Sequence, residues 1–132
     1  MSHENVENSE RVWAMFVAGE IESMRAFVDQ KAEIHDVPEV PGARVFHGPE
    51  GWREQIGSFS EAFTDLRYER LESIDCGETV IAAIHATGVA TSSGIPGEVT
   101  YAQAETWRNG KIVLLRYFIS REAALEAVGL SG

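Results

Sequence analysis

The chain has 132 residues, of which 44% are hydrophobic and 24% are charged, a composition typical of a folded domain and too apolar for a disordered chain. Its 21 acidic residues outnumber its 11 basic residues and give a formal net charge of −10. A field of that sign repels nucleic-acid phosphates and anionic lipid headgroups. We therefore expect a single domain over residues 1–132, with no nucleic acid and no membrane among its partners.

Cys76 is the only cysteine, so the chain can form neither an internal disulfide nor a multi-cysteine zinc site. The N-terminal segment contains no apolar stretch of signal-peptide length. An unbroken apolar run such as Val80 to Ile84 is far too short to span a bilayer. These features predict a soluble cytoplasmic protein.

Helical periodicity dominates the first half of the chain. Apolar residues recur at helix-face spacing before Gly19, and Glu20–Val28 predicts a short second helix with acidic residues in its first turn. A third helix is predicted to begin at Gly48-Pro49, because proline is tolerated in the first turn of a helix. Its apolar face consists of residues at helical intervals: Trp52, Ile56, Phe59 and Phe63. That face is expected to pack on a hydrophobic sheet.

Extended segments lie between and after these helices. Residues 32–36 (AEIHD) predict a short strand, and the prolines of segment 37–46 predict a loop with a brief extended stretch. Four longer strands follow, at residues 66–74, 79–91, 99–108 and 111–119. Asn109-Gly110 predicts a tight hairpin between the last two, and Arg121–Val128 predicts a final helix. Helices followed by strands are typical of an α+β fold.

A resemblance to a known family is carried by four stretches: AGEIESMRAFVDQKAEIHD, FHGPEGWREQIGSF, DCGETVIAAIHATG and TWRNGKIVLLRYFISREAALEAVGL. In the order and spacing of these stretches, the chain resembles the SnoaL-like branch of the nuclear transport factor 2 (NTF2-like) superfamily. That superfamily includes ketosteroid isomerases, polyketide cyclases and limonene epoxide hydrolases. The resemblance implies an NTF2-like cone, in which a curved antiparallel sheet packs on N-terminal helices around an internal apolar pocket. It also implies a small apolar ligand and a homodimer.

Asp36 is the first candidate for a catalytic residue. It ends a predicted strand, where an apolar cavity would raise its pKa and make it a useful base. The resemblance implies the same role, because the interval from Gly19 to Asp36 equals that from the helix-breaking glycine to the catalytic base of ketosteroid isomerases. The alternative is a structural role, in which Asp36 caps the turn before the prolines.

The partners of that base in ketosteroid isomerases are a tyrosine and an aspartic acid, and the resemblance places Val12 and Gln103 at their positions. Gln103 can still donate a hydrogen bond to an enolate. Strand alternation places Tyr101, Gln103, Glu105 and Trp107 on one face. We expect this face to line the pocket; the alternative is that the small residues between them face inward and the large ones form a dimer interface.

The last strand places Leu114, Arg116, Phe118 and Ser120 on one face. Many members of the resembling family have Tyr-x-Asp where this chain has Phe118-Ile119-Ser120, so the second carboxylate that an epoxide hydrolase needs is missing. Arg116 is a candidate pocket residue. The alternative for Arg116 is an ion pair with Glu105 on the adjacent strand.

The histidines show none of the spacings of a zinc site, so we expect no metal ion. The chain also has no glycine-rich phosphate loop and no G-x-S-x-G elbow, so we expect no cofactor and no serine nucleophile. His47, just before the third helix, is a candidate acid or base at the pocket mouth.

These residues lead to the hypothesis of a small-molecule enzyme, either an isomerase or an aldol-type cyclase. Asp36 removes a proton from carbon next to a carbonyl, and Gln103, helped by His47 or Tyr101, stabilises the enolate. The expected substrate-binding residues are Trp13, Phe16, Phe59, Phe63, Tyr101, Glu105, Arg116 and Phe118. The alternative is a non-catalytic domain that binds an apolar ligand or acts as a dimeric scaffold, and a weaker one is an epoxide hydrolase.

Overall fold

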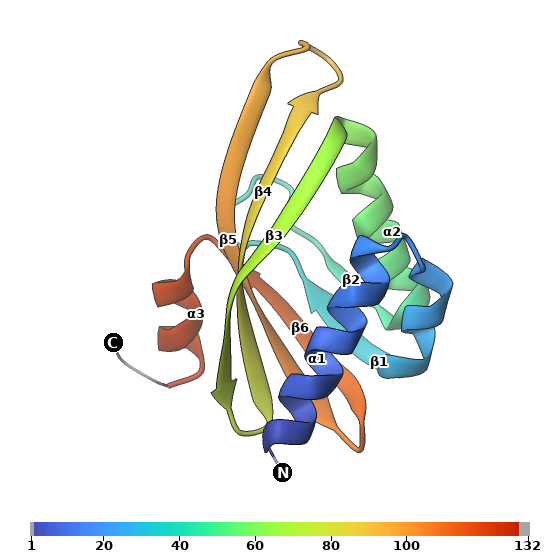
Figure 1. Cartoon of the computed structure of the whole chain (residues 1–132), viewed down its shortest axis with the longest axis vertical. Coiled ribbons are helices and arrows are strands. Elements are labelled where there is room, and N and C mark those ends of the chain that lie inside the picture. Colours follow the sequence, from blue (N-terminus) through green and yellow to red (C-terminus); the bar gives the residue numbers. More distant parts are fainter. Residues whose placement is uncertain (1, 130–132) are drawn as a thin grey trace.

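Six strands form one curved sheet in the order β2-β1-β6-β5-β4-β3 (Figure 1). The structure is a computed structural model that describes residues 2–129, with side chains from residue 4 onward. The strands are β1 (Val28–His35), β2 (Val45–His47), β3 (Phe63–Cys76), β4 (Thr79–Ala90), β5 (Pro96–Arg108) and β6 (Lys111–Phe118). The last four are antiparallel neighbours, as predicted. The sheet as a whole is mixed, because β1 pairs with β6 in parallel.

The helices lie on both faces of this sheet (Figure 1). They are α1 (Ser2–Val17), the 3-10 helix η1 (Ile21–Phe27), α2 (Gly48–Ala62) and α3 (Arg121–Ala127). α1, η1 and α2 cover the inner face, and α3 packs on the outer face. The predicted second helix is therefore a 3-10 helix, and β1 begins four residues before the predicted strand. None of the helices in the described part of the chain is long and apolar enough to cross a membrane.

Gly48 sets the position of α2 against β1. Its φ angle is +70°, and a Cβ atom on it would lie 2.8 Å from the backbone oxygen of Gln30. Only glycine permits both the left-handed backbone and this close approach. Pro49 then occupies the first turn, where the missing N–H leaves no intrahelical bond unmade. The start of α2 is thus fixed on the strand that ends at the candidate base.

Two hydrophobic clusters hold the layers together. The inner cluster joins α1, η1 and α2 to the sheet and includes Val12, Met24, Trp52 and Trp107. The outer cluster lies under α3 and includes Ile81, Ala102, Ala104 and Leu125. The two alanines of β5 therefore face outward, and the large residues between them face the helices. This geometry decides between the two orientations of β5 in favour of the pocket.

Candidate functional site

A cavity of about 380 Å³ lies between the N-terminal helices and the inner face of the sheet. It is lined by Val12, Trp13, Phe16, Met24, Asp36, Val37, Val40, Trp52, Gln55, Ile56, Phe59, Tyr68, Val99, Tyr101, Gln103, Glu105 and Tyr117. Seven of these side chains are aromatic, and only four carry an amide or a carboxylate. A cavity of this size and composition is typical of a site for a small, largely apolar molecule.

The lining contains seven of the residues singled out in the sequence. These are Trp13, Phe16, Asp36, Phe59, Tyr101, Gln103 and Glu105. Phe63 lies outside it, with its ring centroid 5.1 Å from that of Phe59. His47 also lies outside it; this residue is exposed in β2, opposite Glu33 of β1.

Arg116 and Phe118 point away from the cavity, contrary to the sequence-based expectation. Their partners across the strand pair are Ala104 and Ala102, which belong to the outer face of the sheet. The Arg116 guanidinium lies 5.4 Å from the Phe118 ring centroid. Glu105 is paired in register with Leu115 and faces inward, so Arg116 and Glu105 lie on opposite faces and form no ion pair.

Asp36 lies directly after β1, in the cavity wall. Its Oδ2 accepts a hydrogen bond from the Arg44 backbone N–H at 3.0 Å, and its Oδ1 accepts one from Gln55 Nε2 at 3.3 Å. The Asp36 N–H in turn donates to the Arg44 carbonyl oxygen. Asp36 therefore closes the loop of residues 37–43, and its carboxylate is at the same time fixed against the cavity.

Three adjacent strands place Asp36, Tyr117 and Gln103 in one row across the sheet. His35 pairs in register with Arg116, so the next residue, Asp36, lies level with Tyr117. Tyr117 in turn pairs with Gln103. Because neighbouring strands lie about 4.8 Å apart, the row spans roughly 10 Å, the scale of a small ring system.

Tyr117 is a hydrogen-bond donor available to a ligand. Its hydroxyl oxygen accepts a hydrogen bond from Trp52 Nε1 at 3.0 Å, and its own proton has no acceptor among the described residues. Burial raises the pKa of the Tyr117 phenol, and the charges of Glu105 and Asp36 raise it further. Burial also raises the pKa of Tyr101. Both phenols therefore keep their protons across the physiological range.

Glu105 is the most deeply buried acid of the site, with only 1% of its surface exposed. Its carboxylate accepts hydrogen bonds from Gln103 Nε2 at 2.9 Å, from Trp107 Nε1 at 3.3 Å and from the Ser9 hydroxyl. Burial raises the pKa of Glu105, and these bonds together with the charge of Arg70 oppose that rise. The Gln103 amide is thereby held in one orientation, with one N–H on Glu105 and a second left for a ligand.

Arg70 supplies the positive charge behind Glu105. Its Nη2 donates to the Ser9 hydroxyl at 2.6 Å and its Nε donates to Ser73 Oγ at 2.9 Å. Burial lowers the pKa of Arg70, and the charges of Glu105 and Glu10 oppose that fall. Ser9 therefore bridges a guanidinium to a carboxylate, and the network joins α1 to β3 and β5.

Several lining residues had no signal in the sequence that assigned them to a site. Tyr68 forms a ring cluster with two residues of α1, and its centroid lies 4.9 Å from that of Phe16 and 6.1 Å from that of Trp13. Tyr117 and Gln55 were not singled out either. Alternation along β6 groups Tyr117 with Leu115 on the face opposite Arg116. Because the sequence-based expectation places the Arg116 face in the pocket, Tyr117 is not identified there as a site residue.

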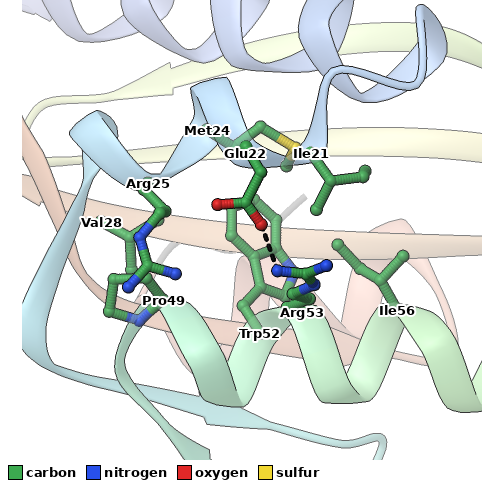
Figure 2. Close-up of a pocket in the computed structure, with 9 residues that line it drawn as sticks. All are labelled: Ile21, Glu22, Met24, Arg25, Val28, Pro49, Trp52, Arg53 and Ile56. Carbon is green, nitrogen blue, oxygen red and sulfur yellow. Dashed lines mark hydrogen bonds and ion pairs between the residues drawn. The ribbon is translucent and has the colours of Figure 1, made fainter.

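A second hollow lies outside the cone, between η1 and α2 (Figure 2). The Glu22–Arg53 ion pair crosses it, and Met24, Trp52 and Ile56 are among the residues that line it (Figure 2). Its volume of about 10 Å³ holds no more than one water molecule. Among the side chains that the structure describes, those of residues 4–129, no three from His, Cys, Asp or Glu gather closely enough to hold a metal ion. The cavity lined by aromatic residues is therefore the candidate site, since the hollow beside Asp65 and Glu98 is an open surface depression without an aromatic residue in its lining.

Solved structures with the same fold support this architecture. An NTF2-like protein from Burkholderia thailandensis has a TM-score of 0.79 and 19% identity, with 86% of this chain and 88% of that chain covered. A proposed SnoaL-like polyketide cyclase from Jannaschia sp. CCS1 has a TM-score of 0.78 and 18% identity, with 98% and 94% covered. A protein from Catenulispora acidiphila with a ketosteroid isomerase-like fold, in complex with trimethylamine, has a TM-score of 0.68 and 14% identity, with 89% and 88% covered.

Identities below 20% establish a shared fold and leave the activity open. No curated protein sequence matches the chain. The SnoaL-like domain family matches residues 9–115, which include the second half of α1, all of η1, α2 and β1 to β5, and most of β6. The chain therefore belongs to the SnoaL-like domain family and has the NTF2-like fold.

Proposed function

We propose that this protein is an enzyme acting on a small molecule, in which Asp36 removes a proton from a carbon atom next to a carbonyl group. The observation that carries the proposal is the fixed Asp36 carboxylate in the wall of a mostly apolar cavity. A general base must be oriented and within reach of the substrate, and two hydrogen bonds orient this one. Isomerisation and aldol-type cyclisation both begin with this step.

Proton removal leaves a negative charge on the carbonyl oxygen, which needs hydrogen-bond donors. Tyr117 and Gln103 lie in the same row as Asp36 and each has a free N–H or O–H. A substrate lying along this row would have its reacting carbon near Asp36 and its carbonyl oxygen near Tyr117. Tyr117 therefore takes the place that the sequence-based hypothesis gave to His47 or Tyr101, and Gln103 keeps its proposed role.

The test uses a nitrobenzisoxazole, whose ring opens when a general base removes one proton and which needs no other catalytic group. We expect Asp36→Asn to lower the wild-type rate by at least about 100-fold, the smaller effect typical of a general base. Asp65→Asn is the matched control, because Asp65 is exposed, lies outside the cavity, and has a φ angle of 54° that asparagine tolerates. Equal rates in wild type and Asp36→Asn would overturn the proposal.

The second candidate function is ligand binding without catalysis. It is favoured by the hydrogen bonds of Asp36, since both carboxylate oxygens already serve the loop and Gln55. In that case Asp36→Asn would leave the background rate unchanged, while apolar ligands would still bind to the cavity. An epoxide hydrolase is less well supported, because Glu105, the only other acid in the described lining, has its carboxylate occupied by three donors.

A homodimer is part of the proposal, through the outer face of the sheet. On β4 that face carries His85, which contacts Glu98 of β5 at 3.2 Å, and α3 covers only the part of the face around Ile81. Light scattering tests this directly: a mass of 14.5 kDa would exclude the dimer, and twice that mass would support it.

A further inference from the structure

The charged side chains of the cavity lining are all acidic. Among the described residues that form it there are two acids, Asp36 and Glu105, and no lysine, arginine or histidine. The whole chain, with these two acids included, has a net charge of −10. A bound anion would therefore meet repulsion without a single cationic partner in the wall, whereas a cation would be attracted.

Asp36 is the acid whose charge remains available to a ligand. Its two protein donors, the Arg44 backbone N–H and the Gln55 amide, are neutral groups. The Arg44 guanidinium forms no ion pair with Asp36 among the described residues; it lies 3.6 Å from Glu54 and 4.4 Å from the Phe46 ring centroid. Glu105 differs, because Arg70 balances it through Ser9. The negative charge of Asp36 thus faces the cavity without a cation beside it.

Aromatic rings line the same cavity as this carboxylate. Tyr117 of β6 and Tyr101 of β5 have ring centroids 6.0 Å apart, and Tyr68 of β3 packs against Trp13 and Phe16 of α1. All five rings line the cavity. The faces of aromatic rings attract cations, and alkylated ammonium groups are the ligands that such rings bind best. An apolar cation gains from these rings and from Asp36 together, whereas a neutral molecule gains only from burial.

We infer that the cavity binds an apolar organic cation whose positive charge lies on nitrogen, an alkylated ammonium or an iminium, with that charge near Asp36. This inference rests on the proposed function for the role of Asp36 as a base. The chemistry agrees with it. When Asp36 takes the proton from the carbon next to an iminium, the C–H electron pair forms a carbon–carbon double bond, and the C=N π pair moves to nitrogen. The product is a neutral enamine beside a neutral carboxylic acid, so no cationic residue is needed in the wall.

The experiment compares three phenols that carry tetrahedral groups of nearly equal size at the para position: trimethylammonio, tert-butyl and sulfonate. Their head groups have charges of +1, 0 and −1, so shape is held constant while charge changes. Titration calorimetry is done at slightly acid pH, where all three phenols keep their proton, and at low and high salt. The variants are Asp36→Asn and the matched control Asp65→Asn, which removes the same formal charge at a distance from the cavity.

We expect the cation to bind to the wild-type protein at least about fivefold more tightly than the neutral phenol, and the sulfonate to bind least. Asp36→Asn should abolish most of that preference, and Asp65→Asn should retain it. Equal or tighter binding of the tert-butyl phenol, no binding of the cation, or an unchanged preference in Asp36→Asn would each overturn the inference. The wild-type ratio alone decides the first two outcomes, even if Asp36→Asn fails to fold.

The two proposals fail in different ways. If Asp36→Asn abolishes ring opening of the benzisoxazole but the cation shows no preference, Asp36 is a base for neutral substrates and only the inference about charge is wrong. If the cation is preferred and ring opening stays at background in every variant, the site binds a cation and the proposed catalysis is wrong.

Discussion

Gly48 offers a test of how closely α2 is packed against β1. In Gly48→Ala the new Cβ would lie 2.8 Å from the Gln30 backbone oxygen, and the residue would keep a φ of +70°. The left-handed backbone costs an alanine about 1–2 kcal/mol, and a clash with a backbone atom adds about 1–3 kcal/mol because neither element can move freely. We expect a total loss of roughly 2–5 kcal/mol in the free energy of unfolding.

Gly42→Ala is the matched control. Gly42 has a φ of +78°, nearly the same as Gly48, and a Cβ there would meet nothing within 4 Å. Its substitution should cost only the backbone component, about 1–2 kcal/mol. Urea unfolding followed by tryptophan fluorescence measures both variants, with Trp52 of α2 as a reporter at the affected element. Equal losses in the two variants would refute the reasoning that a steric contact with β1 fixes α2.

Three further predictions concern the polar groups of the cavity. Burial raises the pKa of Glu105, so the stability contributed by its protonated form is complete below the ordinary carboxyl pKa and is lost as pH rises through the raised value. Urea unfolding across pH should therefore show a steeper decline of stability with pH in wild type than in Glu105→Gln. Parallel curves for the two proteins would contradict this. Arg70→Met should lower the free energy of unfolding by about 2 kcal/mol, because it leaves Glu105 without a counter-charge. In a double-mutant cycle, adding Glu105→Gln should recover at least half of that loss. Additive losses would show that the two groups are independent. Tyr117→Phe should cost about 1–3 kcal/mol in thermal or urea unfolding, because it leaves Trp52 Nε1 without its acceptor, and an unchanged stability would mean that this hydrogen bond contributes nothing.

Local signals in the sequence were sufficient for much of the fold. The Asn109-Gly110 hairpin forms with φ angles of 54° and 76°, as an Asn-Gly pair permits. The last helix begins at Arg121, as predicted, and the Ser120 side chain accepts a hydrogen bond from the Ala123 N–H at its start. The extent of β1 could not be predicted in the same way. Its first residues gain their pairing from Ile112 of β6, which is distant in the sequence and leaves no trace in local periodicity.

The site was predictable where alternation and burial agree, as along β5. Gln103 and Glu105 face the cavity as expected, although nothing in the sequence indicated that Arg70 would lie behind them. Along β6 both faces carry bulky residues, so periodicity could not decide which one faces inward, and the face with Arg116 was the wrong choice. A carboxylate at a strand end, such as Asp36, could be located from sequence, but its partners Arg44 and Gln55 come from a loop and a helix whose approach only the fold defines.

The bridge from Arg70 through Ser9 to Glu105 also determines how molecules reach the cavity. It attaches the middle of α1 to the sheet by a buried polar contact. Moving that helix outward would remove Ser9 and leave the charges of Arg70 and Glu105 buried without the hydroxyl that joins them. The opposite side is different: Val40, Phe59 and Val99 line the cavity and yet are 52%, 38% and 47% exposed. The cavity is therefore accessible to solvent beside these three residues, and the loop that Asp36 closes, which contains Val40, forms part of the rim of that opening.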